Sequence, residues 1–244
     1  MRVHQQPAYI LLNRPYSETS WIVEAFSREH GRLSLMAKGA RRLKSKLKGV
    51  LFPFQPVLLS WVGKGEMPTL TSAEIDQSEF DLFTHELKGD ALVCGFYCNE
   101  LVVNLLHRHD PHQSLFDQYH STIMTMNAQI DSMLMASTLR EFEQVVMRET
   151  GYEVSFDYES DGRTAIEANG FYYFQPHQGF VRVNNQYHPK VISGRIILTL
   201  KQNVAELQPK DLSQSKHLMR DILTQILGTK KIVSRELFLP KLRD

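Results

Sequence analysis

Long apolar runs are absent from this sequence of 244 residues. No segment approaches the ~18 to 20 uncharged apolar residues that a helix needs to cross a bilayer. The N-terminal segment holds only a short apolar core, at positions 9–12, and this core is too short for a secretory signal. We therefore expect a cytoplasmic protein without a membrane partner.

Cysteine is also scarce, because Cys94 and Cys98 are the only two in the chain. They lie four residues apart in a segment with helical periodicity, so their thiols face the same way. No second cysteine pair completes a tetrahedral zinc site, and His107 and His109 lie two or more turns further on. Small buried residues in a reducing compartment are the better interpretation. We predict no metal and no cofactor.

Motifs that carry catalysis or bind nucleotides are missing as well. The Gly-Lys-Gly sequence at residues 63–65 lacks both the first glycine and the Ser or Thr of a P-loop. A tight hairpin turn explains it better. No serine occupies a G-x-S-x-G context, and neither cysteine has the surroundings of a nucleophile. We expect no catalytic residues, and therefore a protein that is not an enzyme.

One acidic segment, at residues 157–162, resembles the first half of a calcium-binding EF-hand loop. Its third position is Glu159 in place of Asp or Asn, and Ala168 stands where the loop requires a bidentate Glu. We interpret the segment as a polar loop. A metal-dependent nuclease that uses Asp157 and Asp161 remains an alternative, and it predicts DNA cleavage with magnesium or manganese.

The charge that is present is unevenly distributed. The chain has a formal net charge of only +1, yet residues 28–48 carry eight Lys and Arg against the single acid Glu29, a balance of +7. The first 80 residues hold eleven cations and seven acids, a balance of +4, and the other 164 hold seventeen and twenty, a balance of −3. Concentrated like charge repels itself, so this segment indicates an external polyanion. A second, weaker basic cluster lies near the C-terminus, at Lys230, Lys231, Arg235, Lys241 and Arg243.

Alternating apolar residues and turn signals predict five short strands, at residues 9–12, 21–26, 32–38, 56–62 and 69–74. Residues 13–18 are expected to form the first turn. Five strands within about 70 residues suit a small barrel, and the OB fold is the commonest such barrel that binds nucleic acid. An SH3-like barrel gives nearly the same pattern. Most aromatic residues of these strands must fill the core.

After residue 80 the apolar residues recur every three or four positions, which predicts helices. We expect them at about 87–105, 115–126, 132–149 and 209–227, with a small hairpin from 171–174 and 179–183 inside an irregular segment at 152–190. The predicted fold class is therefore α+β. A five-stranded OB-type β-barrel, residues 1–79, precedes a mainly α-helical domain, residues 80–244, with a small β-hairpin insertion.

Several sequence strings carry a family resemblance. They are RPYSETS at 14–20, AKGAR at 37–41, LKG at 47–49, FPF at 52–54, NEL at 99–101, GY at 151–152 and SRELF at 234–238. Together they resemble the RecO family of bacterial DNA repair proteins over nearly the full length. The resemblance implies an OB barrel followed by a helical domain, in agreement with the pattern of strands and helices.

The resemblance also implies a function. RecO proteins are recombination mediators: they bind single- and double-stranded DNA, anneal complementary strands, and load RecA onto DNA coated by single-stranded-DNA-binding protein. The implied partners are therefore DNA, that coating protein, RecR, and further RecF and RecA, with the chain alone a monomer near the nucleoid. Many relatives carry a four-cysteine zinc module after the third helix, and this chain has no cysteine there, so it resembles the zinc-free branch.

Two sets of residues are candidates for binding. For DNA we predict Arg28, Arg32, Lys38, Arg41, Arg42, Lys44, Lys46, Lys48 and Lys64, because phosphates need a track of cations. A helical groove with an arginine at its rim can capture a peptide with an acidic tail. The resemblance implies that the tail of the coating protein docks in this way, and we assign Phe116, Leu139, Arg140 and Phe142 to it. A pure adaptor, whose basic segment is merely solvated, remains an alternative.

Overall fold

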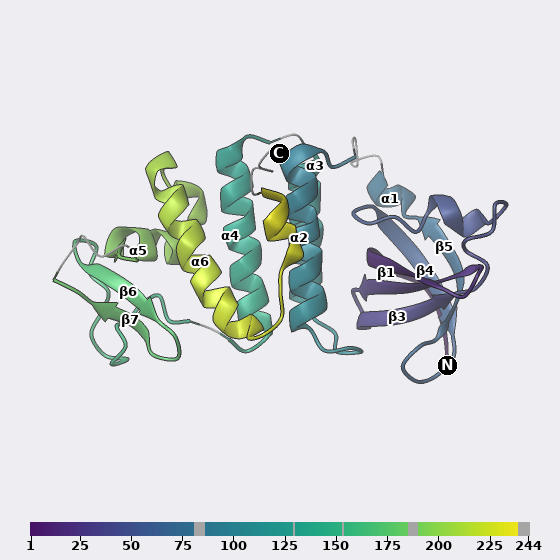
Figure 1. Ribbon diagram of the computed structural model, residues 1–244, viewed down its shortest axis with the longest axis horizontal. Coiled ribbons are helices and arrows are strands. Elements are labelled where there is room, and N and C mark those ends of the chain that lie inside the picture. Colours follow the sequence, from purple (N-terminus) through teal and green to yellow (C-terminus); the bar gives the residue numbers. More distant parts are fainter. Residues whose placement is uncertain (81–85, 129, 153, 185–189, 239–244) are drawn as a thin grey trace, which may run out of the picture. The chain divides into compact units, whose positions relative to one another are not determined.

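The structure is a computed structural model that describes residues 1–80, 86–128, 130–152, 154–184 and 190–238 (Figure 1). The chain forms two compact units. The first, the barrel unit, comprises Met1–Gln129 and the segment that starts at Ile232, and the second unit is Ile130–Lys231. The barrel unit thus contains two long helices as well as the barrel. The predicted domain boundary at residue 79 stays a prediction.

Five strands form a closed barrel in the order β1-β2-β3-β5-β4. They are β1 (Arg2–Tyr16), β2 (Ser20–Ser27), β3 (Gly31–Ala37), β4 (Pro56–Val62) and β5 (Thr69–Ile75). β3 and β5 pair in parallel, whereas the other neighbours are antiparallel. The predicted five-stranded OB-type barrel is confirmed.

The first strand is much longer than predicted, because β1 pairs with both β2 and β4. The prediction of a turn at residues 13–18 was wrong for its first part. Asn13 and Arg14 pair with Val23 and Ile22 in the ladder, although their side chains give no apolar alternation. Only residues 17–19 form the turn between β1 and β2.

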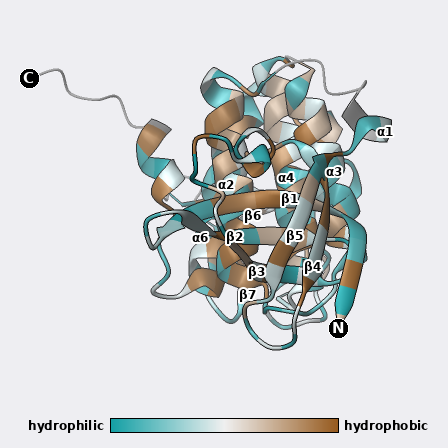
Figure 2. Cartoon of the chain, turned by 90° about the vertical axis from the view of Figure 1, so that its right-hand side faces the viewer, coloured by the Kyte–Doolittle hydropathy of each residue, from teal (hydrophilic) through white to brown (hydrophobic). Residues whose placement is uncertain are grey.

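Alternate side chains of the strands fill the barrel. The buried cluster includes Val23, Leu35, Val57, Leu59 and Trp61. Each lies on the inner face of its strand because successive residues of a strand point to opposite sides. Figure 2 shows hydrophobic residues concentrated in the strands and hydrophilic residues in the loops that connect them.

The barrel unit also contains α1 (Gln77–Phe80), α2 (Gly89–Leu105), α3 (Gln113–Asn127) and a C-terminal 3-10 helix, η4 (Val233–Phe238). An aromatic cluster joins α3 to the barrel. Phe116 lies 5.9 Å from Tyr9 and 5.4 Å from Phe26 between ring centroids, and Tyr119 lies 5.0 Å from Tyr9. We call these four residues the aromatic cluster. Such ring pairs are stabilised beyond their buried area.

A buried hydrogen-bond chain connects the same elements. Tyr119 donates to Asn99 Oδ1 at 2.5 Å, and Asn99 Nδ2 donates to the carbonyl of Leu11 at 2.9 Å. Burial raises the pKa of Tyr119 well above its usual value, so its phenol stays protonated. Cys94 and Cys98 of α2 are both buried, as predicted.

Glycine is required at Gly31, the first residue of β3, by a close approach of another segment of the chain. Its φ is +64°, a conformation that costs other residues strain, and an added Cβ would lie 2.0 Å from the carbonyl oxygen of Asp110. The segment after α2 thus packs directly onto the start of β3. His109 N also donates to the carbonyl of Arg32 at 2.8 Å.

The second unit contains helices α4 (Ser132–Glu149), α5 (Gly194–Gln202) and α6 (Leu212–Leu227) and a three-stranded sheet in the order β7-β6-β8. The strands are β6 (Phe171–Gln175), β7 (Gly179–Arg182) and β8 (Ile192–Ser193). The predicted hairpin is β6 and β7, and the predicted helices at 132–149 and 209–227 are present, the latter beginning as 3-10 turn Pro209–Asp211. In the described part of the chain, no helix combines the length and the apolar content required to cross a membrane.

Candidate nucleic-acid interface

The segment between β3 and β4 gathers most of the predicted cations. We call residues 38–49 the cationic loop. It ends in a short 3-10 helix, η1 (Lys46–Gly49). The side chains of six predicted residues in it are exposed, namely Lys38, Arg41, Arg42, Lys44, Lys46 and Lys48.

Arg41 anchors the beginning of the cationic loop. Its backbone N–H donates to the carbonyl of Thr19 at 2.9 Å, and its Nη1 donates to the carbonyl of Ser17 at 2.8 Å. Its guanidinium lies 5.7 Å from the ring centroid of Trp21, within range of a cation–π contact. The loop is therefore attached to the end of the β1–β2 hairpin.

A second set of contacts anchors the chain that follows the cationic loop. Asn13 Nδ2 of β1 donates to the carbonyl of Leu51 at 2.6 Å, and Ile10 pairs with Pro53 in a parallel bridge. Backbone hydrogen bonds within the loop close its turns, such as Ser45 N to the carbonyl of Arg42 at 3.0 Å. The loop is thus fixed at both ends to β1 and the β1–β2 turn.

The positive charge of the cationic loop is not neutralised by neighbouring acids. No Asp or Glu occurs from Lys38 to Gln55. Across the ranges described above, no ion pair joins a cation of the loop to a carboxylate. Uncompensated cations at this density create a positive potential that attracts phosphates and other anions.

Arg28 and Arg32 lie outside the cationic loop and contact the helices of the barrel unit. Arg28 donates from Nε and Nη2 to both carboxylate oxygens of Asp117 on α3, at 2.8 and 3.0 Å. The hydrogen bond from Arg28 lowers the pKa of Asp117. Arg32 is half-buried and donates to the carbonyl of Val103 at 2.5 Å, and burial lowers the pKa of Arg32. Both side chains therefore connect the barrel to helices.

The remaining predicted cations lie elsewhere. Lys64 is exposed in the β4–β5 turn. In the C-terminal basic cluster, the Arg235 guanidinium lies 5.5 Å from the ring centroid of Tyr97. Lys241 and Arg243 lie outside the described residues.

The four residues assigned to an acidic tail are distributed over both units. Phe116 belongs to the aromatic cluster of the barrel unit. Leu139, Arg140 and Phe142 lie on α4 of the second unit, where Phe142 is fully buried. Arg140 is only 6% exposed and is paired with Glu143, with Nη2–Oε1 at 2.8 Å and Nε–Oε2 at 2.6 Å. Its charge is thus balanced within its own helix.

In the acidic segment at residues 157–162, Asp157 and Asp161 bind other groups of the protein. Asp161 accepts the backbone N–H groups of Arg163 and Thr164, each at 2.8 Å, and the Thr164 hydroxyl at 2.6 Å. These bonds, led by the one from the Thr164 hydroxyl, lower the pKa of Asp161 to about 2. Asp157 is paired with Lys201. Among the described residues, no three His, Cys, Asp or Glu side chains are grouped to hold a metal ion.

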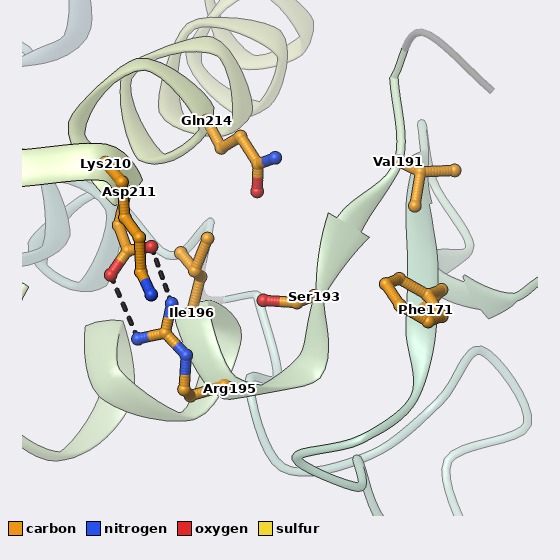
Figure 3. A pocket seen from close by; sticks show the side chains of 8 residues that line it. All are labelled: Phe171, Val191, Ser193, Arg195, Ile196, Lys210, Asp211 and Gln214. Atoms are coloured by element: carbon orange, nitrogen blue, oxygen red, sulfur yellow. Dashed lines mark hydrogen bonds and ion pairs between the residues drawn. The ribbon is translucent and has the colours of Figure 1, made fainter. Parts of the chain in front are cut away.

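A pocket of about 320 Å³ lies in the second unit (Figure 3). It is lined by Phe171, Val191, Ser193, Arg195, Ile196, Lys210, Asp211 and Gln214. Arg195 of α5 donates two hydrogen bonds to Asp211, at 2.9 and 2.6 Å, and the Arg195 bond lowers the pKa of Asp211. The pair fixes α5 to the beginning of α6. The sequence pattern had not indicated this pair of Arg195 and Asp211.

The substitution Asp211→Asn is expected to make the free energy of unfolding depend less on pH in the acidic range. Because the folded-state pKa of Asp211 is lowered, its contribution is present above its unfolded-state pKa of about 3.9 and is lost as pH falls through the folded value. The side chain of the partner Arg195 is 41% exposed, so we expect the substitution to lower the free energy of unfolding by about 1 kcal/mol at neutral pH. Urea unfolding of both proteins should show this difference shrinking below about pH 4. A difference that persists unchanged into acid contradicts the assignment, and Asp221→Asn, in the exposed pair with Lys190, is the control.

The fold and the candidate site define the class of protein. In this class an OB-type barrel with a fixed cationic loop is followed by helices and a small sheet. Two family models match the chain, "Recombination protein O N terminal" over residues 1–78 and "Recombination protein O C terminal" over residues 87–236. The chain belongs to the RecO family of DNA repair and recombination proteins.

Individual relatives match nearly the whole of this chain. A DNA repair protein RecO of Burkholderia lata is 40% identical over 240 residues, which are 98% of this chain and 83% of the relative. One from Polynucleobacter necessarius is 40% identical over 96% of both chains. One from Dechloromonas aromatica is 38% identical over 97% of this chain and 96% of its own.

Proposed function

We propose that this protein is a non-enzymatic recombination mediator that binds single- and double-stranded DNA and anneals complementary strands. The observation that carries the proposal is the cationic loop, whose backbone is fixed at both ends and whose exposed cations pair with no carboxylate among the described residues. A preformed track of cations binds phosphates without first ordering a flexible loop. Lys64 extends the proposed DNA-binding surface. Arg28 and Arg32 also belong to this proposed surface, although each contacts a helix of the barrel unit as well.

Annealing follows from the same electrostatics. Two strands repel each other through their phosphates, and each phosphate neutralised by a Lys or Arg releases condensed counterions. A loop that binds both strands raises their local concentration and lowers the repulsion between them. This mechanism requires no covalent step and no metal. It predicts that annealing falls steeply as salt rises.

The partners proposed for this chain are those that the family resemblance implies: RecR, RecF, RecA and the single-stranded-DNA-binding protein, in the cytoplasm at the nucleoid. We propose Leu139, Arg140 and Phe142 of α4 for the acidic tail of the coating protein, and the assignment of Phe116, in the barrel unit, stays a sequence-based prediction. An incoming tail carboxylate would have to replace Glu143 on Arg140, because Glu143 accepts a hydrogen bond from Nη2 and lies in ion-pair contact with Nε. Tail capture is thus an exchange of one carboxylate for another.

A strand-annealing assay with a salt titration tests the proposal. Complementary oligonucleotides are mixed with the protein, either naked or coated with single-stranded-DNA-binding protein, and pairing is followed by fluorescence. We expect faster annealing of naked strands at low salt and a loss of acceleration as salt rises. On coated strands, Arg140→Ala should lose acceleration while it keeps full activity on naked strands.

Three results would overturn parts of the proposal. No acceleration on any strand, with retained binding to the acidic tail, indicates an adaptor without direct DNA binding. Shortened strands in the presence of magnesium, lost on Asp157→Ala, indicate a nuclease. Equal activity of Arg140→Ala on coated strands removes Arg140 from the tail site.

A further inference from the structure

Two exposed aromatic rings lie beside the cationic loop. Phe52 is 56% exposed and Tyr16 is 51% exposed. The other large aromatic residues in or next to the strands are buried, as with Phe26, Phe54 and Trp61, or half-buried under Arg41, as with Trp21. An exposed phenyl ring has no role in the barrel core, so Phe52 in particular is available for a ligand.

Each ring is the chain neighbour of a residue that fixes the cationic loop. Phe52 follows Leu51, whose carbonyl accepts from Asn13 of β1, and precedes Pro53, which bridges to Ile10. Tyr16 precedes Ser17, whose carbonyl accepts from Arg41. The backbone on both sides of Phe52 is thus held against β1, and the ring projects from a fixed point.

Cations lie close to Phe52 in the chain. The cations of η1, Lys46 and Lys48, come just before Phe52 in the chain. Aromatic faces next to cations are the combination that binds a single strand by base stacking and phosphate contacts together.

We propose that Phe52, with Tyr16 as a second ring, stacks on bases of a single strand whose phosphates lie on the cationic loop. The inference rests on the proposed DNA binding and assigns its strand preference to these rings. Cations bind the phosphates of single strands and duplexes alike, whereas stacking requires bases that are not already paired. Phe52 is therefore a specificity-determining residue that favours single strands.

Phe52→Leu tests the proposal, because leucine keeps an apolar side chain and removes the aromatic face. The probes are a fluorescent oligothymidine and a fluorescent duplex of equal length, measured by anisotropy over a range of salt. We expect Phe52→Leu to weaken binding of oligothymidine about 5- to 150-fold and to leave duplex binding within about twofold. The salt slope should not change, because no phosphate contact is lost. Tyr16→Leu should show the same pattern.

The control is Tyr158→Leu, an exposed ring between the acidic residues Asp157 and Glu159, which should leave both affinities unchanged. If Phe52→Leu binds oligothymidine as tightly as the unmodified protein, stacking is wrong and the cationic loop alone carries DNA binding. An equal loss on both probes also overturns the inference, because it indicates a changed loop conformation. If the unmodified protein binds neither probe, the proposed function itself fails, which is a different result.

Discussion

Reversing four charges of the cationic loop is expected to lower the affinity for DNA by at least about 100-fold at ~0.15 M salt. The four residues to change to glutamate are Arg42, Lys44, Lys46 and Lys48. They are exposed, and the reversal replaces attraction to phosphates with repulsion. Arg41 is left in place, because it anchors the loop to Ser17 and Trp21, and its loss would change the conformation as well as the charge.

A matched control separates this local effect from net charge. Changing Arg148, Arg163, Lys210 and Arg220 to glutamate alters the net charge equally on exposed positions of the second unit. We expect this control to bind DNA nearly as well as the unmodified protein at moderate salt, where the Debye length is ~8 to 10 Å. Equal losses in both variants would mean that net charge, not the cationic loop, determines binding.

Phe116→Ala is expected to destabilise the protein by about 3 to 5 kcal/mol. Phe116 is buried, and its ring contacts Tyr9 and Phe26 of the barrel. Removal of the ring leaves a cavity between α3 and the barrel and removes two aromatic contacts. Urea unfolding measured by circular dichroism checks the value.

The same variant tests the assignment of Phe116 to an acidic tail. Tyr152→Ala, at an exposed position of the second unit, should change stability by less than about 0.5 kcal/mol. If Phe116→Ala kept full stability and lost binding to an acidic-tailed peptide, Phe116 would belong to a binding site. If it loses stability as expected, its main role is to hold α3 on the barrel.

The regular elements could be predicted from the sequence where one face is buried. β4 and α4 begin and end as predicted, at Pro56–Val62 and Ser132–Glu149, because their apolar residues recur with the period of a strand or helix. The ends of β1 could not be predicted, since Asn13 and Arg14 pair through backbone groups and their side chains carry no pattern. α5 was missed because its apolar run at residues 196–198 fits a buried strand as well as a helix.

The sequence predicted where the positive charge of the candidate site lies. It did not predict which residues the arginine side chains contact. The density of Lys and Arg located the cationic loop. It could not show that Arg28 binds Asp117, which lies 89 residues further along the chain, or that Arg32 donates to Val103. Arg140 shows the same limit at short range, because its partner Glu143 lies on the same helix, and burial of the pair depends on how α4 packs.

The salt dependence of DNA affinity tests the central claim most directly. Affinity for single-stranded DNA is measured across a range of salt for the unmodified protein and for the variant with the four reversed loop charges. Each phosphate contact contributes about 0.7 to the slope of log affinity against log salt. We predict a steep slope for the unmodified protein and a reduction of about 3 in the variant. Equal slopes in the two proteins would contradict binding of DNA by the cationic loop.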